Sequence, residues 1–346
     1  MSARVSIIIL NYNCRKYLEP CLVSLSRLAY SDYEMIIVDN NSSDGSAKYL
    51  EQFLEINSKV RVVFNRTNFG YARGNNLGAF QANGDYLFFL NPDTRIDPNC
   101  LKEMIKMFED DSTVGAIQSL LLRAGFNPPV IDCSGGFIDR FGWSYKRDYD
   151  RQLYSLTEDL EIFYAMGAAL LVRKDQFVEI GGFDEEMFLY HEDIDLCWRY
   201  RLSGRRVIIA PKALVYHLGG AAETESRNGK IIYYREKNHL ITLYKNYANK
   251  RLILYLPIVY LLYILSFFYF FFLNGDKVKG FAYLQAIWWS LSHMPLLISK
   301  RFKARPKRKV SDSAVEKYFL GNIVVGDILR KIVIGYLRRF KPRSEL

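Results

Sequence analysis

The sequence has few cysteines and no motif that would use them. The five cysteines are scattered along the chain and never occur as a CxxC pair. This excludes a disulfide-stabilised scaffold and a cysteine-rich zinc site, and it favours a reducing compartment. The chain also lacks a secretory signal, because the apolar run that follows Arg4 is short and stops at Asn11. We therefore expect the N-terminal part to stay in the cytosol.

Acidic residues are scarce in the last third of the chain. Residues 233–346 contain 21 Lys and Arg but only 6 Asp and Glu, whereas residues 1–232 contain 26 and 31. The net charge is therefore +15 in the C-terminal part and −5 before it. A uniformly basic chain would suggest nucleic acid, but a basic region interleaved with long apolar runs suggests an anionic membrane surface. We expect a membrane partner and no nucleic acid.

Short apolar runs alternate with helical patterns in the first part of the chain. The runs that resemble buried strands are Val5–Leu10, Glu34–Val38, Val60–Phe64 and Tyr86–Leu90. This alternation predicts an α/β domain with a largely parallel sheet and helices on both faces. A further strand is predicted over Phe163–Arg173, after an irregular stretch over Arg123–Asp159. Ligands of such sheets bind beyond the carboxyl ends of the strands.

Polar clusters follow the first two predicted strands. The first contains Asn11 and Asn13, and the second runs from Asp39 to Gly45. Asn, Ser, Asp and Gly are the residues of turns and helix caps, and the second cluster by itself favours that interpretation. A carboxylate at a strand end can also accept the imide N–H of a pyrimidine base. Both roles stay open for Asp39.

Two more clusters lie farther along. The stretch Asn68–Gly78 has glycines spaced GxxxGxxxG and carries Arg73, so it is either a diphosphate cradle at a helix N-terminus or a glycine-rich loop packed on the sheet. Asn91-Pro92-Asp93 ends an apolar strand. A carboxylate in that place suits Mg²⁺ or Mn²⁺, which typically bind one or two protein carboxylates together with substrate phosphates. The alternative for Asp93 is a turn cap.

Three carboxylates crowd the start of a predicted helix over His191–Leu202. Glu192, Asp193 and Asp195 repel each other unless the helix dipole offsets their charge or one of them acts as a general base. His217 follows a further predicted strand over Val207–Pro211. A single histidine is more often structural than a ligand.

Together these segments resemble family 2 of the nucleotide-sugar glycosyltransferases, which have the GT-A fold, and in particular rhamnosyltransferase-like members. The matching stretches cover residues 4 to about 220 and read VSIIILNYN, IIVDNNSSDGS, NFGYARGNNLG, LFFLNPDT, GAALLVRKDQFVEIGGFDEEMFLYHEDIDLCWR and VYHLGG. The resemblance implies an inverting transfer of a sugar from a nucleotide diphosphate donor, with dTDP-rhamnose or a UDP-sugar favoured, to a hydroxyl of a lipid-linked saccharide in cell-surface glycan synthesis.

The resemblance also implies roles for individual residues. Asp193 matches the presumed catalytic base, with Glu192 beside it, and the GGFDE segment at Gly181–Glu185 would line the acceptor side. Asp93 stands where the family's DxD-type metal motif ends, and His217 aligns with a metal-binding histidine of some relatives. Because Asn91 replaces the first carboxylate of that motif, the number of protein ligands is open. The donor-binding residues would be Asn11, Asn13, Asp39, Asn68, Gly70, Arg73, Asn76 and Asn91.

Three other functions are possible on the sequence alone. A polyprenyl-phosphate sugar synthase shares the fold and transfers to a phosphate, which needs no strong base. A non-catalytic membrane protein could keep a degenerate transferase domain for binding, and Asn91 is its only support. A dinucleotide oxidoreductase is disfavoured, since the first predicted βα turn contains no glycine.

The C-terminal part is expected to attach the protein to the cell membrane. Leu252–Leu273 is 22 residues without a formal charge, and a helix of that length spans about 33 Å. We expect residues 1–232 to be the catalytic domain, 233–251 a basic juxtamembrane helix, 252–299 a membrane hairpin and 300–346 a basic amphipathic tail. The positive-inside rule places the catalytic domain and the tail in the cytosol. The second run, Phe281–Ser299, could instead be re-entrant or lie along the membrane.

Overall fold

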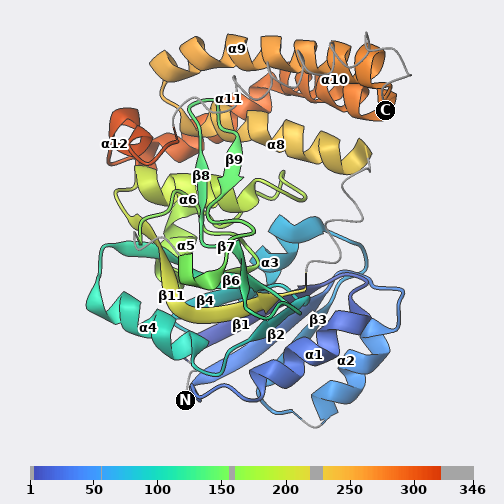
Figure 1. Ribbon diagram of the computed structural model, residues 1–346, viewed down its shortest axis with the longest axis vertical. Coiled ribbons are helices and arrows are strands. Elements are labelled where there is room, and N and C mark those ends of the chain that lie inside the picture. Colours follow the sequence, from blue (N-terminus) through green and yellow to red (C-terminus); the bar gives the residue numbers. More distant parts are fainter. Residues whose placement is uncertain (1–3, 56, 156–159, 219–228, 321–346) are drawn as a thin grey trace.

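The computed structural model describes residues 4–55, 57–155, 160–218 and 229–320. Gly219, Gly220 and most of the predicted C-terminal tail lie outside these ranges. A curved sheet with helices on both faces forms the lower part of the molecule, and a stack of C-terminal helices lies above it (Figure 1). The active-site candidates all belong to the lower part.

The first half of the sheet is parallel, as the sequence predicts. Its strands pair in the order β3-β2-β1-β4. They are β1 (Val5–Asn11), β2 (Tyr33–Asp39), β3 (Val60–Phe64) and β4 (Tyr86–Leu90). Alternate residues face opposite sides, so Ile8 packs under α3 (Gly70–Gln81) while Ile7 and Ile9 pack under α1 (Arg15–Leu25). The second helix, α2 (Ser46–Glu55), lies beside α1 (Figure 1).

Beyond β4 the sheet is mixed. β10 (Ala169–Arg173) runs antiparallel to both β4 and β6 (Val114–Arg123), and β11 (Arg206–His217) runs parallel to β6. The predicted strand over Phe163–Arg173 is therefore shorter than expected. The stretch predicted to be irregular contains several short strands, which are β7 (Val130–Cys133), β8 (Gly136–Ile138) and β9 (Ser144–Lys146), and β5 (Thr94–Ile96) precedes them.

The described part of this domain also contains three more helices and a short 3₁₀ turn. α4 (Cys100–Asp110) covers the same face as α1, and α5 (Lys174–Ile180) and α6 (Glu192–Leu202) cover the opposite face. The 3₁₀ turn is Leu153–Ser155. The architecture confirms the predicted GT-A-type α/β fold, a curled mixed sheet flanked by helices.

The C-terminal helices form a separate layer on the side of α6. They are α8 (Gly229–Asn246), α9 (Asn249–Phe268), which continues as a π-helix over Tyr269–Asn274, α10 (Lys277–Ser292), α11 (Met294–Ala304), a 3₁₀ turn over Arg305–Lys307, and α12 (Asp312–Glu316). α8 lies between α6 and the α9–α10 pair (Figure 1), and it runs across the predicted domain boundary at residue 232.

One helix of the described chain, Asn249–Asn274, is long and apolar enough to cross a membrane by length and composition alone. The second predicted apolar run is not one helix. It is divided between α10 and α11 at His293, because Pro295 cannot continue α10 and instead occupies the first turn of α11.

Candidate active site

Polar side chains from several strand ends and one helix start meet in a cleft of about 310 Å³. The predicted site residues that line this cleft are Asn68, Gly70, Asn91, Asp93, Glu192, Asp193 and His217. The structure thus brings the predicted base and the predicted metal ligands to one place from distant parts of the chain. The remaining predicted residues lie outside its lining, and these are Asn11, Asn13, Asp39, Arg73 and Asn76.

Glu192 and Asp193 form the first turn of α6, where the helix dipole favours negative charge. Glu192 is only 5% exposed, and its Oε2 has no hydrogen-bond partner among the described residues. The carboxylate of Asp193 accepts from the backbone N–H of Ile194 at 2.8 Å and of Gly167 at 3.1 Å. Burial raises the pKa of both carboxyl groups, and the charge of Asp193 raises the pKa of Glu192 further. Carboxyl groups with a raised pKa are suited to proton transfer.

The backbone that enters this helix is strained. Tyr190 and His191 have φ angles of 70° and 69°, which residues other than glycine rarely adopt. The amide of Asn238 on α8 donates to the carbonyls of Leu189 and Tyr190, both at 2.8 Å. The C-terminal layer therefore holds the strained turn that presents Glu192.

The loop before α3 approaches this same turn closely. Asn68 accepts from the backbone N–H of Gly70 at 2.8 Å, and the N–H of Tyr71 donates to the carbonyl of Phe188 at 2.6 Å. Gly70 has φ of 76°, and a Cβ there would lie 2.3 Å from the Phe188 oxygen. Only glycine fits, so the glycine identified in the sequence serves a close backbone approach between the two walls of the cleft.

The residues after β1 and β2 are joined in a turn. Asp39 is 2% exposed; its Oδ1 accepts from the amide of Asn11 and the hydroxyl of Ser42, both at 2.7 Å, and its Oδ2 accepts from the Ser42 N–H at 3.0 Å. Asn13 accepts from the Ser43 N–H at 2.7 Å. Asp39 is thus engaged in the turn that its sequence cluster by itself favours, and base recognition by Asp39 stays a prediction.

The other predicted donor-binding residues have different surroundings. Asn76 exchanges two hydrogen bonds with the backbone of Phe183, at 2.9 and 3.0 Å, and so ties α3 to the GGFDE segment. Arg73 is exposed, 3.8 Å from a carboxylate oxygen of Glu185. Asn91 borders the cleft, and its carbonyl accepts from the hydroxyl of Thr94.

His217 lies between two carboxylates. Its Nδ1 donates to Asp132 at 2.9 Å, and its Nε2 lies 3.3 Å from Oδ2 of Asp93. Burial by itself would lower the pKa of His217, but the hydrogen bonds to Asp132 and Asp93 outweigh it and raise that pKa to about 9. Burial by itself would raise the pKa of Asp132. The hydrogen bond from His217 and the charge of Lys146, which lies 2.8 Å away, outweigh burial and lower that pKa to about 2.

This arrangement fits a divalent cation that is coordinated partly by the protein and partly by the phosphates of the donor. Among the described residues no group of three His, Cys, Asp or Glu side chains is placed to hold a metal alone. Asp93 and His217 offer one carboxylate and one imidazole at the cleft wall. Mg²⁺ and Mn²⁺ bind in this way when substrate phosphates complete the shell, and a metal-bound histidine commonly donates its other N–H to a carboxylate, as His217 does to Asp132.

Sequence reasoning missed some residues of the site. Asn40 lines the cleft and donates to Asn68 and to the carbonyl of Gly70. Asp132 lies in a stretch of sequence without a motif. It is recognised as part of the site only through its contact with His217 in the structure. Asn238 belongs to a helix that was assigned to the membrane-proximal region. Because the same helix also buries Glu236, Lys237 and His239, no sequence signal singles out Asn238.

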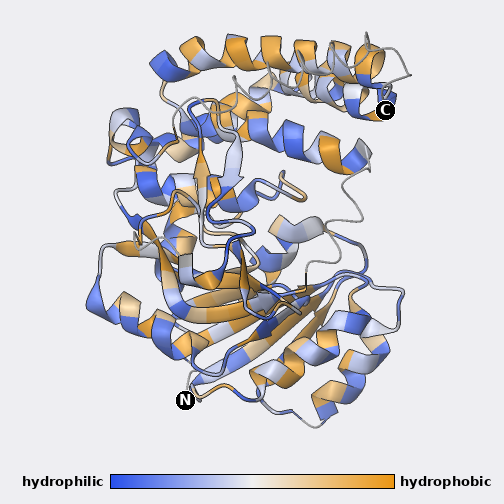
Figure 2. Ribbon diagram, viewed as in Figure 1, coloured by the Kyte–Doolittle hydropathy of each residue, from blue (hydrophilic) through white to orange (hydrophobic). Residues whose placement is uncertain are grey.

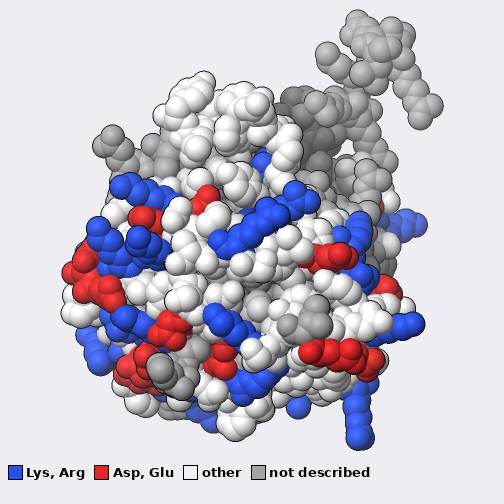
Figure 3. All heavy atoms as spheres, turned by 90° about the horizontal axis from the view of Figure 1, so that it is seen from below, with Lys and Arg blue, Asp and Glu red and all other residues white. Residues whose placement is uncertain are grey.

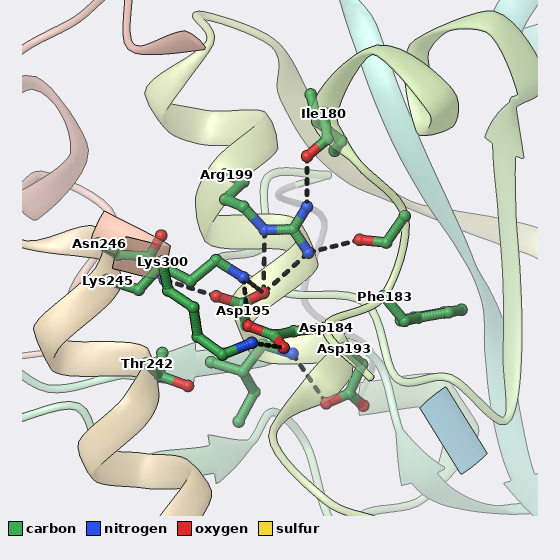
Figure 4. Close-up of polar contacts among 12 residues, drawn as sticks. Ile180, Phe183, Asp184, Asp193, Asp195, Arg199, Thr242, Lys245, Asn246 and Lys300 are labelled. Atoms are coloured by element: carbon green, nitrogen blue, oxygen red, sulfur yellow. Dashed lines mark hydrogen bonds and ion pairs between the residues drawn. The ribbon is translucent and has the colours of Figure 1, made fainter. Parts of the chain in front are cut away.

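The GGFDE segment does not line the cleft. Its Phe183 packs in the core, and its Asp184 forms ion pairs with Lys245 of α8 and Lys300 of α11 (Figure 4). Arg199 on α6 pairs with Asp195 at 2.8 Å and donates to the carbonyls of Ile180 and Gly182. The segment therefore connects α6 to the C-terminal helices.

An α/β sheet of this topology, with a cleft at its strand ends and carboxylates on two walls, defines the GT-A class of nucleotide-sugar transferases. The sequence places the chain within that class. The family model for glycosyl transferase family 2 matches residues 6–180, and the chain belongs to this family.

Two curated proteins illustrate the range of similar sequences. A poly-beta-1,6-N-acetyl-D-glucosamine synthase of Staphylococcus aureus is 27% identical over 216 residues, which cover 62% of this chain and 50% of the synthase. The chain thus spans about half the length of that relative. An N-acetylglucosaminyl-diphospho-decaprenol L-rhamnosyltransferase of Mycobacterium tuberculosis is 25% identical over 245 residues, covering 63% of this chain and 76% of the relative.

Solved structures support the fold. A mannosyltransferase from Pyrobaculum calidifontis, in complex with GDP-Man and Mn²⁺, aligns with a TM-score of 0.53 at 15% identity. The alignment covers 99% of this chain and 89% of the mannosyltransferase.

Proposed function

We propose that the protein is a metal-dependent, inverting glycosyltransferase that moves a sugar from a nucleotide diphosphate donor to a hydroxyl of a lipid-linked saccharide. The observation that carries this proposal is the position of Glu192 and Asp193 in the same cleft as Asp93 and His217. One wall supplies a base for an acceptor, and the other supplies ligands for a cation beside a diphosphate.

The chemistry follows from these positions. A hydroxyl is a poor nucleophile until a carboxylate removes its proton, and Asp193 takes this role. The acceptor oxygen forms a bond to the anomeric carbon while the bond from that carbon to the diphosphate oxygen breaks. A single displacement of this kind inverts the anomeric configuration. When bound by Asp93 and His217, Mg²⁺ or Mn²⁺ would stabilise the negative charge on the departing diphosphate.

The donor is proposed to be dTDP-rhamnose or a UDP-sugar. The similarity to an L-rhamnosyltransferase and to an N-acetylglucosamine polymer synthase supports both possibilities. The lipid-linked acceptor rests on the decaprenol-linked substrate in the rhamnosyltransferase's name and on the apolar C-terminal helices. We place the protein at the cell membrane, with its catalytic domain on the cytoplasmic face.

A screen of donors tests this function. Purified protein is incubated with UDP-, dTDP- and GDP-sugars and Mn²⁺, and nucleotide diphosphate release is followed with and without a polyprenyl-diphosphate-linked saccharide. Acceptor-stimulated release that EDTA abolishes supports the proposal. Transfer to polyprenyl phosphate instead would identify a polyprenyl-phosphate sugar synthase, and binding of a donor without any release would identify a non-catalytic protein.

A further inference from the structure

The exposed face of α9 is more apolar than its buried face. Side chains that carry hydroxyl groups, Tyr255, Tyr263 and Ser266, face the protein interior. Beyond the first turn, where Asn249 and Lys250 are exposed, the exposed side chains of α9 are Ile253, Leu254, Pro257, Ile258, Leu261, Ile264, Leu265 and Phe268. A helix on the surface of a soluble protein shows the opposite pattern. This face is therefore suited to hydrocarbon and not to water.

The apolar surface continues onto the next two helices. On α10, Trp288 is 73% exposed and Phe281 is 48% exposed, and on α11, Phe302 is 62% exposed. Figure 2 shows apolar colouring along most of α9, at one end of the molecule, as well as in the strands of the sheet. On the face at the other end, Lys, Arg, Asp and Glu side chains are spread over much of the surface (Figure 3). Exposed apolar side chains thus occur on three successive helices, which is the kind of surface that marks an interaction site.

The inner face of α9 is fixed along α8, and the two helices run antiparallel. The ring of Tyr255 packs on Tyr247, with centroids 5.4 Å apart. Farther along, the hydroxyl of Tyr260 bonds to that of Tyr244 at 2.8 Å. Near the middle of α9, Tyr263 shares a hydrogen bond of 2.7 Å with His239. These contacts fix the direction of α9 relative to the catalytic domain.

This packing conflicts with a crossing of the bilayer by α9. Tyr263 lies near the midpoint of the 26-residue apolar helix and also bonds to the carbonyl of Glu236. If α9 crossed, the charged residues Arg235, Glu236 and Lys237 of α8 would stand at the level of the bilayer centre. Charged side chains are costly at that depth. The strained catalytic turn held by Asn238 would be drawn toward the hydrocarbon with them.

Basic residues lie at both ends of α9. Lys250 and Arg251 are in its first turn, and Lys277 and Lys279 follow its end, with Asp276 beside them. The positive-inside rule would place lysines at one end of a crossing helix. Lysines at both ends suit a helix whose two ends face the same anionic leaflet.

We propose that α9, α10 and α11 lie flat in the cytosolic leaflet of an anionic bilayer, with the exposed apolar face in the lipid and α8 between the lipid and the cleft. The loop between α9 and α10 then stays on the cytosolic side. This inference rests on the proposed membrane attachment of the transferase. It replaces the membrane-crossing hairpin expected from the sequence with a one-sided attachment, and it puts the cleft one helix layer from the lipid headgroups.

Depth measurements on the full chain test this geometry. Single cysteines replace Ile253, Leu261 or Phe268 in a chain with Cys14→Ser, and each is spin-labelled in vesicles of phosphatidylethanolamine and phosphatidylglycerol. Ile253 and Phe268 are about 22 Å apart along the helix. We expect all three labels at one shallow depth, within about 5 Å of each other. A deepest label at Leu261, with the other two near opposite surfaces, would overturn the proposal.

A second measurement shows on which side of the membrane the loop between α9 and α10 lies. Asn274→Cys in sealed vesicles, with the catalytic domain outside, should react with a membrane-impermeant maleimide as fast as in detergent. Protection until the vesicles are lysed would show a crossing helix. Nucleotide diphosphate release in the same samples reports the transferase function separately, so failure of either idea is seen independently.

Vesicle binding then tests the lipid-facing surface. Leu261→Glu should lower the fraction of protein that sediments with the anionic vesicles by at least about tenfold, since a charge replaces an apolar side chain in the lipid. Val23→Glu changes an exposed apolar residue of α1, in the other half of the molecule, and should have no effect. Equal binding by both variants would contradict the assigned surface.

Discussion

Lys245 and Asp195 form a buried ion pair with a separation of 2.9 Å, in which Asp195 has no exposed surface. The same ammonium group lies 2.8 Å from Asp184, and Asn246 donates to Asp195 at 2.9 Å (Figure 4). Asp195 follows Asp193 by two residues in α6, whereas Lys245 belongs to α8. The pair therefore joins the C-terminal helices to the turn that carries the proposed base.

We expect Lys245→Met to destabilise the fold strongly. Removing one partner of a buried pair leaves the other charge uncompensated, which typically costs about 3–5 kcal/mol. Here the loss concerns Asp184 and Asp195 together, although Lys300 and Arg199 retain part of the compensation. Chemical denaturation measures the change. Lys250→Met alters an exposed lysine nearby and should change stability by less than about 0.5 kcal/mol. Similar values for both variants would contradict a structural role for the pair.

Asp193→Asn should abolish transfer and leave donor affinity within a few-fold of the wild type. Asparagine keeps the size, and its single amide oxygen can still accept from one of the two backbone N–H groups, that of Ile194 or that of Gly167, so the fold should survive. General-base catalysis typically contributes about 10²–10⁴-fold, and the turnover number should fall by that factor. Turnover above about a tenth of wild type would place the base elsewhere, or would favour a phosphate acceptor that needs no base.

The pH dependence of transfer should reflect the carboxyl pair. A base acts only when ionised, so a raised pKa means that activity is lost as the pH falls through that raised value. Burial raises the pKa of Asp193 and of Glu192, and we expect the acid midpoint of the turnover number to lie above the ordinary carboxylate value of about 4. Glu192→Gln leaves one ionisable group and should reduce the acid limb to a single step. A midpoint at or below about 4 would be inconsistent with this pair.

The sequence predicts the part of the fold that depends on local pattern. Continuous apolar runs identify β1, β2 and β4, which are largely buried on both faces, and also β3, which is apolar although it lies at the sheet edge with Arg61 and Phe64 exposed. The sequence does not predict that β10 lies between β4 and β6 and runs antiparallel to both, because strand direction is set by tertiary pairing and not by composition. The short strands β7, β8 and β9 are not predicted either, because a strand of three or four residues is too short to show a periodic pattern.

The site residues that the sequence could predict are those that lie in recognisable motifs and have side chains suited to the chemistry. Asp93 and His217 follow strand ends, and the structure places Glu192 and Asp193, at the start of α6, in the same cleft. The roles of Asp132 and Asn238 depend on contacts across 85 and 48 residues of sequence, and no local pattern encodes those contacts. The engagement of Asp39 with Asn11 likewise needs the register of β1 against β2.

Metal dependence should trace to Asp93 and then to His217. Asp93→Ala removes the carboxylate of the proposed site and should abolish Mn²⁺-dependent donor binding in calorimetry. His217→Ala should weaken it, and Asp132→Asn should do so by a smaller factor, about 10–100-fold at most, because it only loosens the orientation of His217. Unchanged metal affinity in Asp93→Ala and His217→Ala would rule out this site. A thermal shift on adding Mn²⁺ with nucleotide diphosphate gives the same comparison without turnover.

Gly70→Ala tests whether close approach of the two cleft walls is required. The substitution introduces a side chain at φ of 76° and brings a Cβ to 2.3 Å from the carbonyl oxygen of Phe188, a backbone atom that cannot rotate away. Loop and turn must separate, so the hydrogen bond from the Tyr71 N–H to that oxygen should be lost.

The matched control for this change is Gly45→Ala. Gly45 has φ of 86°, but a Cβ there meets nothing within 4 Å. Both variants therefore carry the cost of a left-handed alanine, about 1–2 kcal/mol, and only Gly70→Ala adds the steric clash. We expect Gly70→Ala to lose more stability than Gly45→Ala by denaturation and to bind donor at least about tenfold more weakly, because Phe188 and Asn68 border the cleft. Equal losses in the two variants would mean that the walls can separate without consequence, and the cleft would then not depend on the contact between Gly70 and Phe188.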